Sequence, residues 1–222
     1  MLKYKCLILD HDDTAVDSTA EIHYPAHVEI MRQIRPTHIP VSLEQWFLKN
    51  YHPGIMEYLK DELKLTDSEM ETEYEIWRDY TSTRTPGFYP GFLDVIHEFY
   101  RRGGIVTVVS HSDVDIIRSH YQMSKENGAV VPDTIFGWTS NADERKPHPF
   151  PINQILEKYQ LEKHEVLVVD DLKPGVLMAK AAGVEIAGAG WGHRISEIET
   201  YMKANCLIYL RTIEEFRDLI LN

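Results

Sequence analysis

Acidic side chains follow two short apolar runs of the sequence. The segment Asp10–Thr14 comes directly after the apolar run Lys5–Leu9. Asp170 and Asp171 follow the run Val166–Val169. Carboxylates this close together repel one another unless a cation or a shared proton relieves the repulsion. Asp and Thr also favour turns, so a simple turn is the alternative interpretation of the first cluster. Because the same pattern recurs at a second strand end, the sequence favours an oxygen-rich site suited to Mg²⁺.

Two further segments carry groups that could bind an anion. Ser110 follows the run Ile105–Val109, and a hydroxyl followed by backbone N–H groups entering a helix makes an anion site. Serine is also a common helix N-cap, which is the competing interpretation. Lys146 precedes Pro147 and could neutralise a phosphate oxygen, although an isolated lysine is more often solvated.

The elements that must position these residues are short, Val- and Ile-rich runs, typical of buried parallel strands. From residue 92 onward these runs alternate with helical patterns. The first helical pattern begins at Phe92 and ends before the glycine pair Gly103-Gly104. This alternation predicts an α/β fold with a doubly wound, Rossmann-like parallel sheet. The expected strands are Lys5–Leu9, Ile105–Val109, Thr134–Trp138, Val166–Val169, Val184–Ala187 and Cys206–Tyr209.

Residues 18–85 break this rhythm, because they contain helix signals and no strand pattern. Capping boxes begin at Ser42 and Thr66. We therefore predict a four-helix cap domain over residues 18–85, inserted after the first strand, and an α/β core formed by residues 1–17 and 86–222. The aromatic residues expected to form the cap's own small core are Trp46, Phe47, Tyr74 and Trp77.

Composition limits the possible functions. The chain has 222 residues and a formal net charge of −12, which opposes binding to nucleic acid or to an anionic membrane surface. No window approaches 18 apolar residues, so we expect no membrane span. Cys6 and Cys206 both lie in apolar runs, and we interpret them as buried thiols of a reducing compartment. These features predict a soluble, cytoplasmic protein, and they do not indicate an oligomeric state.

Four motifs in this order resemble the haloacid dehalogenase superfamily, in the subgroup of phosphohydrolases with a helical cap after the first motif. That subgroup includes phosphoglycolate phosphatases and β-phosphoglucomutases. The residues that carry the resemblance are Asp10, Asp12 and Thr14 in the first motif, Ser110 in the second, Lys146-Pro147 in the third and Asp170-Asp171 in the fourth. Asp13 stands where glycine is common in the family.

The resemblance implies a role for each of these residues. Asp10 would be the nucleophile that forms an aspartyl-phosphate, and Asp12 the general acid and then the general base. Ser110 and the backbone of His111 would hold a phosphoryl oxygen, and Lys146 would neutralise charge in the transition state.

The resemblance also implies a Mg²⁺ cofactor. A carboxylate oxygen of Asp10, the backbone carbonyl of Asp12 and the side chain of Asp171 would bind the metal. Asp170 would act through a metal-bound water. Because relatives that cleave carbon–halogen bonds lack the second aspartate, the presence of Asp12 favours phosphoryl transfer.

The expected function is Mg²⁺-dependent hydrolysis of a small phosphorylated metabolite. Two alternatives stay open: a phosphomutase of the β-phosphoglucomutase type, and a non-catalytic binding module with the same fold. His23 resembles a substrate-side histidine of the β-phosphoglucomutases and is the candidate substrate contact in the cap. An ordinary histidine at a domain interface is its alternative interpretation.

Overall fold

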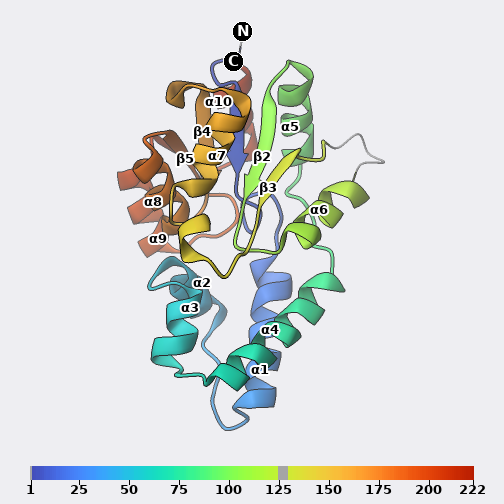
Figure 1. Cartoon of the computed structure of the whole chain (residues 1–222), viewed down its shortest axis with the longest axis vertical. Helices are drawn as coiled ribbons and strands as arrows, with labels where there is room; N and C mark the ends of the chain where they lie inside the picture. The colour runs from blue at the N-terminus through green and yellow to red at the C-terminus, as the bar shows by residue number, and fades with distance from the viewer. Residues whose placement is uncertain (1, 125–129) are drawn as a thin grey trace. The chain divides into compact units, whose positions relative to one another are not determined.

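The computed structural model describes residues 2–124 and 130–222, and it divides the chain into two compact units (Figure 1). The first unit comprises the residues up to Val16 together with Phe88–Asn222, and the second comprises Asp17–Gly87. The residues expected to form a cap, 18–85, fall within the second unit.

The first unit is built on a parallel sheet whose described strands follow the order β3-β2-β1-β4-β5-β6. This order reverses at β1, which lies between β2 and β4, and it is the doubly wound arrangement predicted from the sequence. The prediction of the fold class is therefore confirmed. The strands are β1 (Cys6–Leu9), β2 (Ile105–Val109), β3 (Thr134–Phe136), β4 (Val166–Asp170), β5 (Glu185–Ala189) and β6 (Ile208–Leu210).

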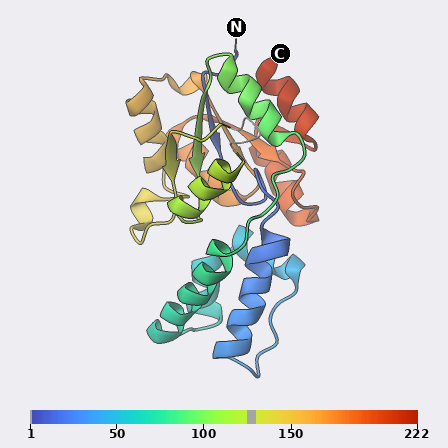
Figure 2. The same cartoon turned by 90° about the vertical axis from the view of Figure 1, so that its right-hand side faces the viewer.

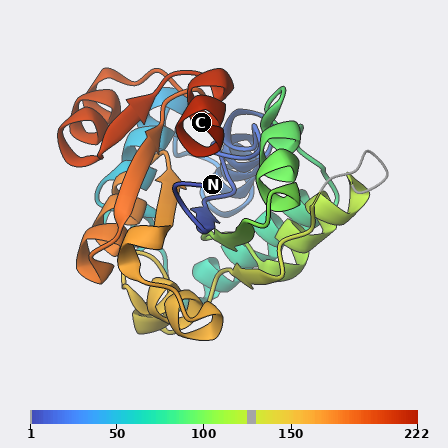
Figure 3. The same cartoon turned by 90° about the horizontal axis from the view of Figure 1, so that it is seen from above.

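Helices cover both faces of this sheet (Figure 3). On one face α5 (Phe92–Arg101), α6 (Val114–Met123) and α10 (Ile213–Leu221) join the inward side chains of the central strands in one apolar cluster. On the other face lie α7 (Phe150–Tyr159), α8 (Lys173–Ala182) and α9 (Ser196–Asn205). Among the described residues, η4 (Ala142–Glu144) and η5 (Lys163–Glu165) are short 3₁₀ turns.

The second unit is helical in its described residues, and α1 packs along α4 (Figure 2). Thr66 and Glu69 form the expected reciprocal capping box, whereas Ser42 only accepts from the backbone of Gln45. The elements are η1 (Thr19–His23), α1 (Tyr24–Ile34), α2 (Leu43–Tyr51), α3 (Ile55–Glu57), η2 (Tyr58–Glu62) and α4 (Asp67–Ser82). Since η1 and η2 are π-helical, the unit is less regular than four plain α-helices.

Aromatic rings form much of the core of the second unit. Trp46 and Tyr58 are buried, and the ring of His27 stacks on Trp46 with 4.1 Å between the ring centroids. Burial lowers the pKa of His27 to about 4, so this ring is neutral at ordinary pH. Tyr74 differs from its expected core position, because it is 44% exposed.

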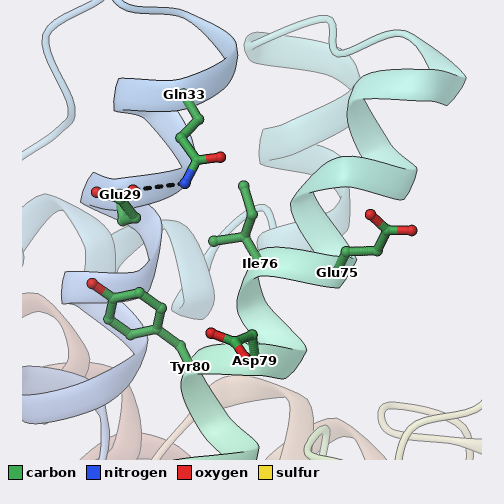
Figure 4. A pocket seen from close by; sticks show the side chains of 6 residues that line it. All are labelled: Glu29, Gln33, Glu75, Ile76, Asp79 and Tyr80. Carbon is green, nitrogen blue, oxygen red and sulfur yellow. Dashed lines mark hydrogen bonds between the residues drawn. The ribbon is translucent and has the colours of Figure 1, made fainter.

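An acidic hollow of about 570 Å³ lies between α1 and α4 (Figure 4). The residues that line it are Glu29, Gln33, Glu75, Ile76, Asp79 and Tyr80. Glu29 already accepts hydrogen bonds from Arg32 and Gln33. The polar groups of the hollow thus partly satisfy one another, and we assign no ligand to it.

The two cysteines are both free thiols, but they differ in burial. Cys6 is buried in β1, whereas Cys206 is only half-buried after α9. The expectation of two buried thiols is therefore wrong for Cys206. Among the described helices, none combines the length and the apolar character that crossing a membrane requires.

Candidate functional site

The acidic residues meet at the carboxyl ends of β1 and β4, where the order of the strands reverses. Leu9 pairs with Val169, so the next residues of both strands, Asp10 and Asp170, lie beside each other. The backbone N–H of Asp10 donates to the carbonyl of Val169 over 2.8 Å. Asp10, Asp170 and Asp171 each offer a carboxylate oxygen, and these oxygens lie within 4.8 Å of one another. Open α/β sheets bind ligands at this edge.

Lys146 joins two of these carboxylates. Its Nζ lies 2.8 Å from Oδ1 of Asp10 and 2.9 Å from Oδ2 of Asp170, and all three side chains are buried. Burial alone would lower the pKa of Lys146, but the two carboxylates raise it above its ordinary value. The lysine is therefore a permanent cation inside the site, and it compensates part of the acidic charge.

Asp170 is held on both of its oxygens. Oδ1 accepts from the backbone N–H of Leu172 over 2.9 Å, while Oδ2 accepts from Lys146. Gly175 allows this arrangement, because a Cβ at that position would lie 2.1 Å from the carboxyl carbon of Asp170. A substitution at Gly175 must therefore displace the carboxylate.

Asp171 is also fixed through both oxygens. The hydroxyl of Thr14 lies 3.4 Å from Oδ1, and Nε2 of His193 lies 3.1 Å from Oδ2. Burial and the adjacent Asp170 raise the pKa of Asp171 to about 8. Burial likewise raises the pKa of Asp10 well above its ordinary value; Lys146 opposes this shift, and the neighbouring carboxylates reinforce it.

Asp12 belongs to a second group of polar residues, which reaches the site from β1 and β2. Oδ2 of Asp12 accepts hydrogen bonds from the hydroxyls of Ser110 at 3.2 Å and Ser112 at 2.6 Å. The N-cap of α6 is Asp113, so Ser110 is not the routine helix cap that we considered as an alternative. Sequence reasoning missed Ser112, although it follows the same strand two residues after Ser110.

His111 contributes through its side chain as well as its backbone. Burial and Lys146 lower the pKa of His111 to about 4, which keeps the ring neutral. Nε2 lies 2.9 Å from the carbonyl oxygen of Lys146, and since that oxygen can only accept, Nε2 donates. The imidazole thus ties the loop that carries Lys146 to the end of β2. The sequence predicted only a backbone role for His111.

The loop after β1 adopts a special backbone conformation. Asp13 has a φ of 56°, in the left-handed region where Gly, Asn and Asp are best tolerated. This explains why Asp can stand where glycine is common in similar sequences.

His11, at the start of the same loop, is buried, and Nε2 of His11 lies 3.0 Å from Nδ1 of His120 in α6.

The donor set fits a hard divalent cation. Three carboxylates share the site with one lysine, and burial together with mutual repulsion raises the pKa of Asp10 and of Asp171. A cation would relieve that repulsion, and oxygen ligands of this kind suit Mg²⁺. Asp10, Asp170 and Asp171 each have a carboxylate oxygen that could bind such an ion.

His23 lies in the second unit, whereas the residues of the acidic site belong to the first. It is half-buried at the end of η1, and the indole N–H of Trp77 donates to its Nδ1 over 3.1 Å. A ring that accepts at Nδ1 is neutral and carries its proton on Nε2. The structure thus defines which nitrogen of His23 can donate a hydrogen bond.

The doubly wound sheet carries a buried acidic cluster at the carboxyl ends of β1 and β4, and a family model identifies the class of protein. The model for haloacid dehalogenase-like hydrolases matches residues 7–189. The chain belongs to this family, as the sequence motifs indicated.

Individual relatives are more distant. A phosphoglycolate phosphatase of Vibrio vulnificus (strain CMCP6) is 26% identical over 139 residues, which are 63% of this chain and 58% of the relative. A phosphoglycolate phosphatase of Vibrio cholerae is 25% identical over 128 residues, covering 56% of this chain and 54% of the relative. The chain thus spans less than two thirds of the length of these curated relatives.

Solved structures share the fold at low sequence identity. A haloacid dehalogenase-like hydrolase from Bacteroides fragilis superposes with a TM-score of 0.79 at 18% identity, covering 96% of this chain and 100% of the other. CbbY from Rhodobacter sphaeroides, in complex with phosphate, gives a TM-score of 0.73 at 19% identity and covers 97% and 96%.

The raised pKa of Asp171 predicts a specific pH dependence of stability. Between the ordinary carboxyl pKa and about 8, the folded protein binds more protons at this position than the unfolded chain. The free energy of unfolding of the metal-free protein must therefore fall as pH rises through this window. Asp171→Asn cannot ionise, so we expect it to be more stable than the wild type at pH 8, with a difference that shrinks toward pH 4.

Urea unfolding in EDTA at several pH values measures this difference. The exposed Asp133 supplies the control Asp133→Asn, which should follow the wild type at every pH. A gap between Asp171→Asn and the wild type that stays constant from pH 5 to pH 8 would contradict the prediction.

Proposed function

We propose that the chain is a Mg²⁺-dependent phosphatase that hydrolyses a small phosphomonoester through an aspartyl-phosphate on Asp10. The observation that carries this proposal is the position of Lys146, whose ammonium group lies 2.8 Å from Asp10 and 2.9 Å from Asp170. A nucleophilic carboxylate needs a nearby cation, because the phosphoryl group that it attacks is itself an anion.

In the first step, a carboxylate oxygen of Asp10 attacks phosphorus and the bond from phosphorus to the ester oxygen breaks. Asp12 gives its proton to the leaving oxygen, so the alcohol departs neutral. The hydroxyl of Ser112, 2.6 Å from Oδ2, fixes Asp12 for this transfer, and the Ser110 hydroxyl, 3.2 Å from Oδ2, would turn from Asp12 to the phosphoryl group when the substrate binds. We assign the Ser110 hydroxyl, the His111 backbone N–H and Lys146 to the phosphoryl oxygens.

In the second step, Asp12 takes a proton from water as the water oxygen attacks phosphorus. The bond between phosphorus and Asp10 breaks, and inorganic phosphate leaves with Asp10 restored. Asp10, the backbone carbonyl of Asp12 and Asp171 would hold Mg²⁺, with Asp170 acting through a bound water. The ion would neutralise phosphoryl charge beside Lys146.

The substrate class is a small phosphorylated metabolite. The curated relatives are named phosphoglycolate phosphatases, which supports 2-phosphoglycolate as the first substrate to test. Sugar phosphates and nucleotide monophosphates are also compatible with the site residues. The net charge of −12 argues against a nucleic acid or anionic membrane partner, and the two free thiols agree with the cytoplasm as the compartment.

We also propose that the second unit acts as a cap and that His23 contributes a substrate contact from it. Trp77 keeps the proton of His23 on Nε2, which makes that atom a hydrogen-bond donor suited to a substrate oxygen. The proposed cap would then select the substrate, while the first unit carries the chemistry.

Hydrolysis of p-nitrophenyl phosphate with and without Mg²⁺ tests the proposed chemistry. We expect metal-dependent release that falls by roughly 10³-fold or more in Asp10→Asn, as for other catalytic nucleophiles. Asp12→Asn should lose about 10²–10⁴-fold, the usual contribution of a general acid–base group. Activity that survives Asp10→Asn would show that the nucleophile is assigned wrongly.

Two other outcomes would favour the alternatives. Transfer of phosphate between positions of a sugar phosphate, without release to water, would favour a phosphomutase. Binding of phosphate esters without turnover of any member of a phosphomonoester panel would favour a non-catalytic module.

The role of His23 is tested with the best substrate from the same panel. We expect His23→Ala to raise the KM for that substrate, since a contact to the substrate is lost. Hydrolysis of p-nitrophenyl phosphate, which lacks the metabolite's other polar groups, should change little. Equal effects on both substrates would argue against a specificity role.

A further inference from the structure

The loop after β5 touches both acidic loops of the site. Nε1 of Trp191 donates to the carbonyl of Thr14 over 2.9 Å. Gly192 packs so closely on the same loop that a Cβ would lie 2.1 Å from the carbonyl oxygen of Asp13. The next residue, His193, reaches Asp171. These three contacts fasten the loop after β1 and the loop after β4 to a single short segment.

We propose that His193 is a positioning residue that holds Asp171 in the orientation needed to bind a divalent cation. Nε2 of His193 lies 3.1 Å from Oδ2 of Asp171, and the two side chains are 4% and 1% exposed. A carboxylate that ligates a metal is ionised and can only accept, so Nε2 of His193 must donate. This inference rests on the proposed metal site.

The hydrogen bond from His193 would raise the affinity for the metal, because a carboxylate that is already held in place loses less conformational freedom when the metal binds. On Oδ1, the carboxylate of Asp171 has a long contact, 3.4 Å, from the Thr14 hydroxyl, so the shorter contact from His193 on Oδ2 is the stronger constraint of the two. Removing such a partner of a metal ligand typically costs about 10- to 100-fold in metal affinity.

A matched pair of substitutions isolates the hydrogen bond. His193→Gln keeps an N–H donor near the position of Nε2, whereas His193→Met has a similar length and no donor. We expect His193→Met to bind Mn²⁺ about 10- to 100-fold more weakly than the wild type, and His193→Gln to recover most of that loss. The readout is the electron paramagnetic resonance signal of free Mn²⁺, titrated without substrate.

Two controls separate positioning from general damage to the fold. His97 is exposed on α5, so His97→Met should bind Mn²⁺ like the wild type. At saturating Mg²⁺, kcat of His193→Met should return to within a few-fold of the wild type, because only the affinity has changed. If His193→Met does not fold, His193→Leu takes its place in the comparison with His193→Gln.

The outcomes distinguish this inference from the proposed function. Equal Mn²⁺ affinity in the wild type and His193→Met would overturn the role of His193 and leave the metal site intact. Equal losses in His193→Met and His193→Gln would also overturn it, because a purely structural role would then explain the effect. A wild-type protein that binds no Mn²⁺ would refute the metal site, and the role of His193 with it.

Discussion

A buried ammonium group between buried carboxylates is the constraint on which the site depends. Lys146 forms ion pairs with Asp10 and Asp170 at the same time. Asp171 adds a third carboxylate to the same cluster. The attraction between the lysine and the carboxylates is strong because water is excluded, but the free-energy cost of burying these charges is also large. One lysine cannot balance three carboxylates, so the site is stable only if it binds a further cation or retains protons.

The fold supplies this arrangement through the ends of neighbouring strands. The register of β1 and β4 places Asp10 beside Asp170, and β2 delivers the two serine hydroxyls that hold Asp12. The second level of support comes from loops: His111 fixes the Lys146 loop, and the loop after β5 fixes Asp171. Most groups of the site are therefore held by a partner from a different strand end. Such preorganisation is what phosphoryl transfer requires of a protein.

The sequence predicted the parts of the site that follow from strand ends, and it could not predict how they are held. Apolar runs ending in acids located Asp10 and Asp170, because parallel strands carry such residues to one edge. The partners depend on tertiary contacts with no local signal. Ser112 meets Asp12 across 100 positions of the sequence, and His193 is one of 11 histidines that show no ligand spacing. The caps predicted at Ser42 and Thr66 begin α2 and α4, whereas the π-helical turns η1 and η2 adjoin α1 and α3 and had no signal in the sequence.

Calorimetric titration of the metal-free protein with Mg²⁺ at pH 7, in buffers of different ionisation enthalpy, tests the central claim most directly. The account predicts one Mg²⁺ per chain with release of protons, because Asp171 has a pKa of about 8 without metal and must ionise to bind it. Asp171→Asn should bind much more weakly. Absence of binding at millimolar Mg²⁺, or equally tight binding by Asp171→Asn, would contradict the claim that this buried acidic cluster is a metal site.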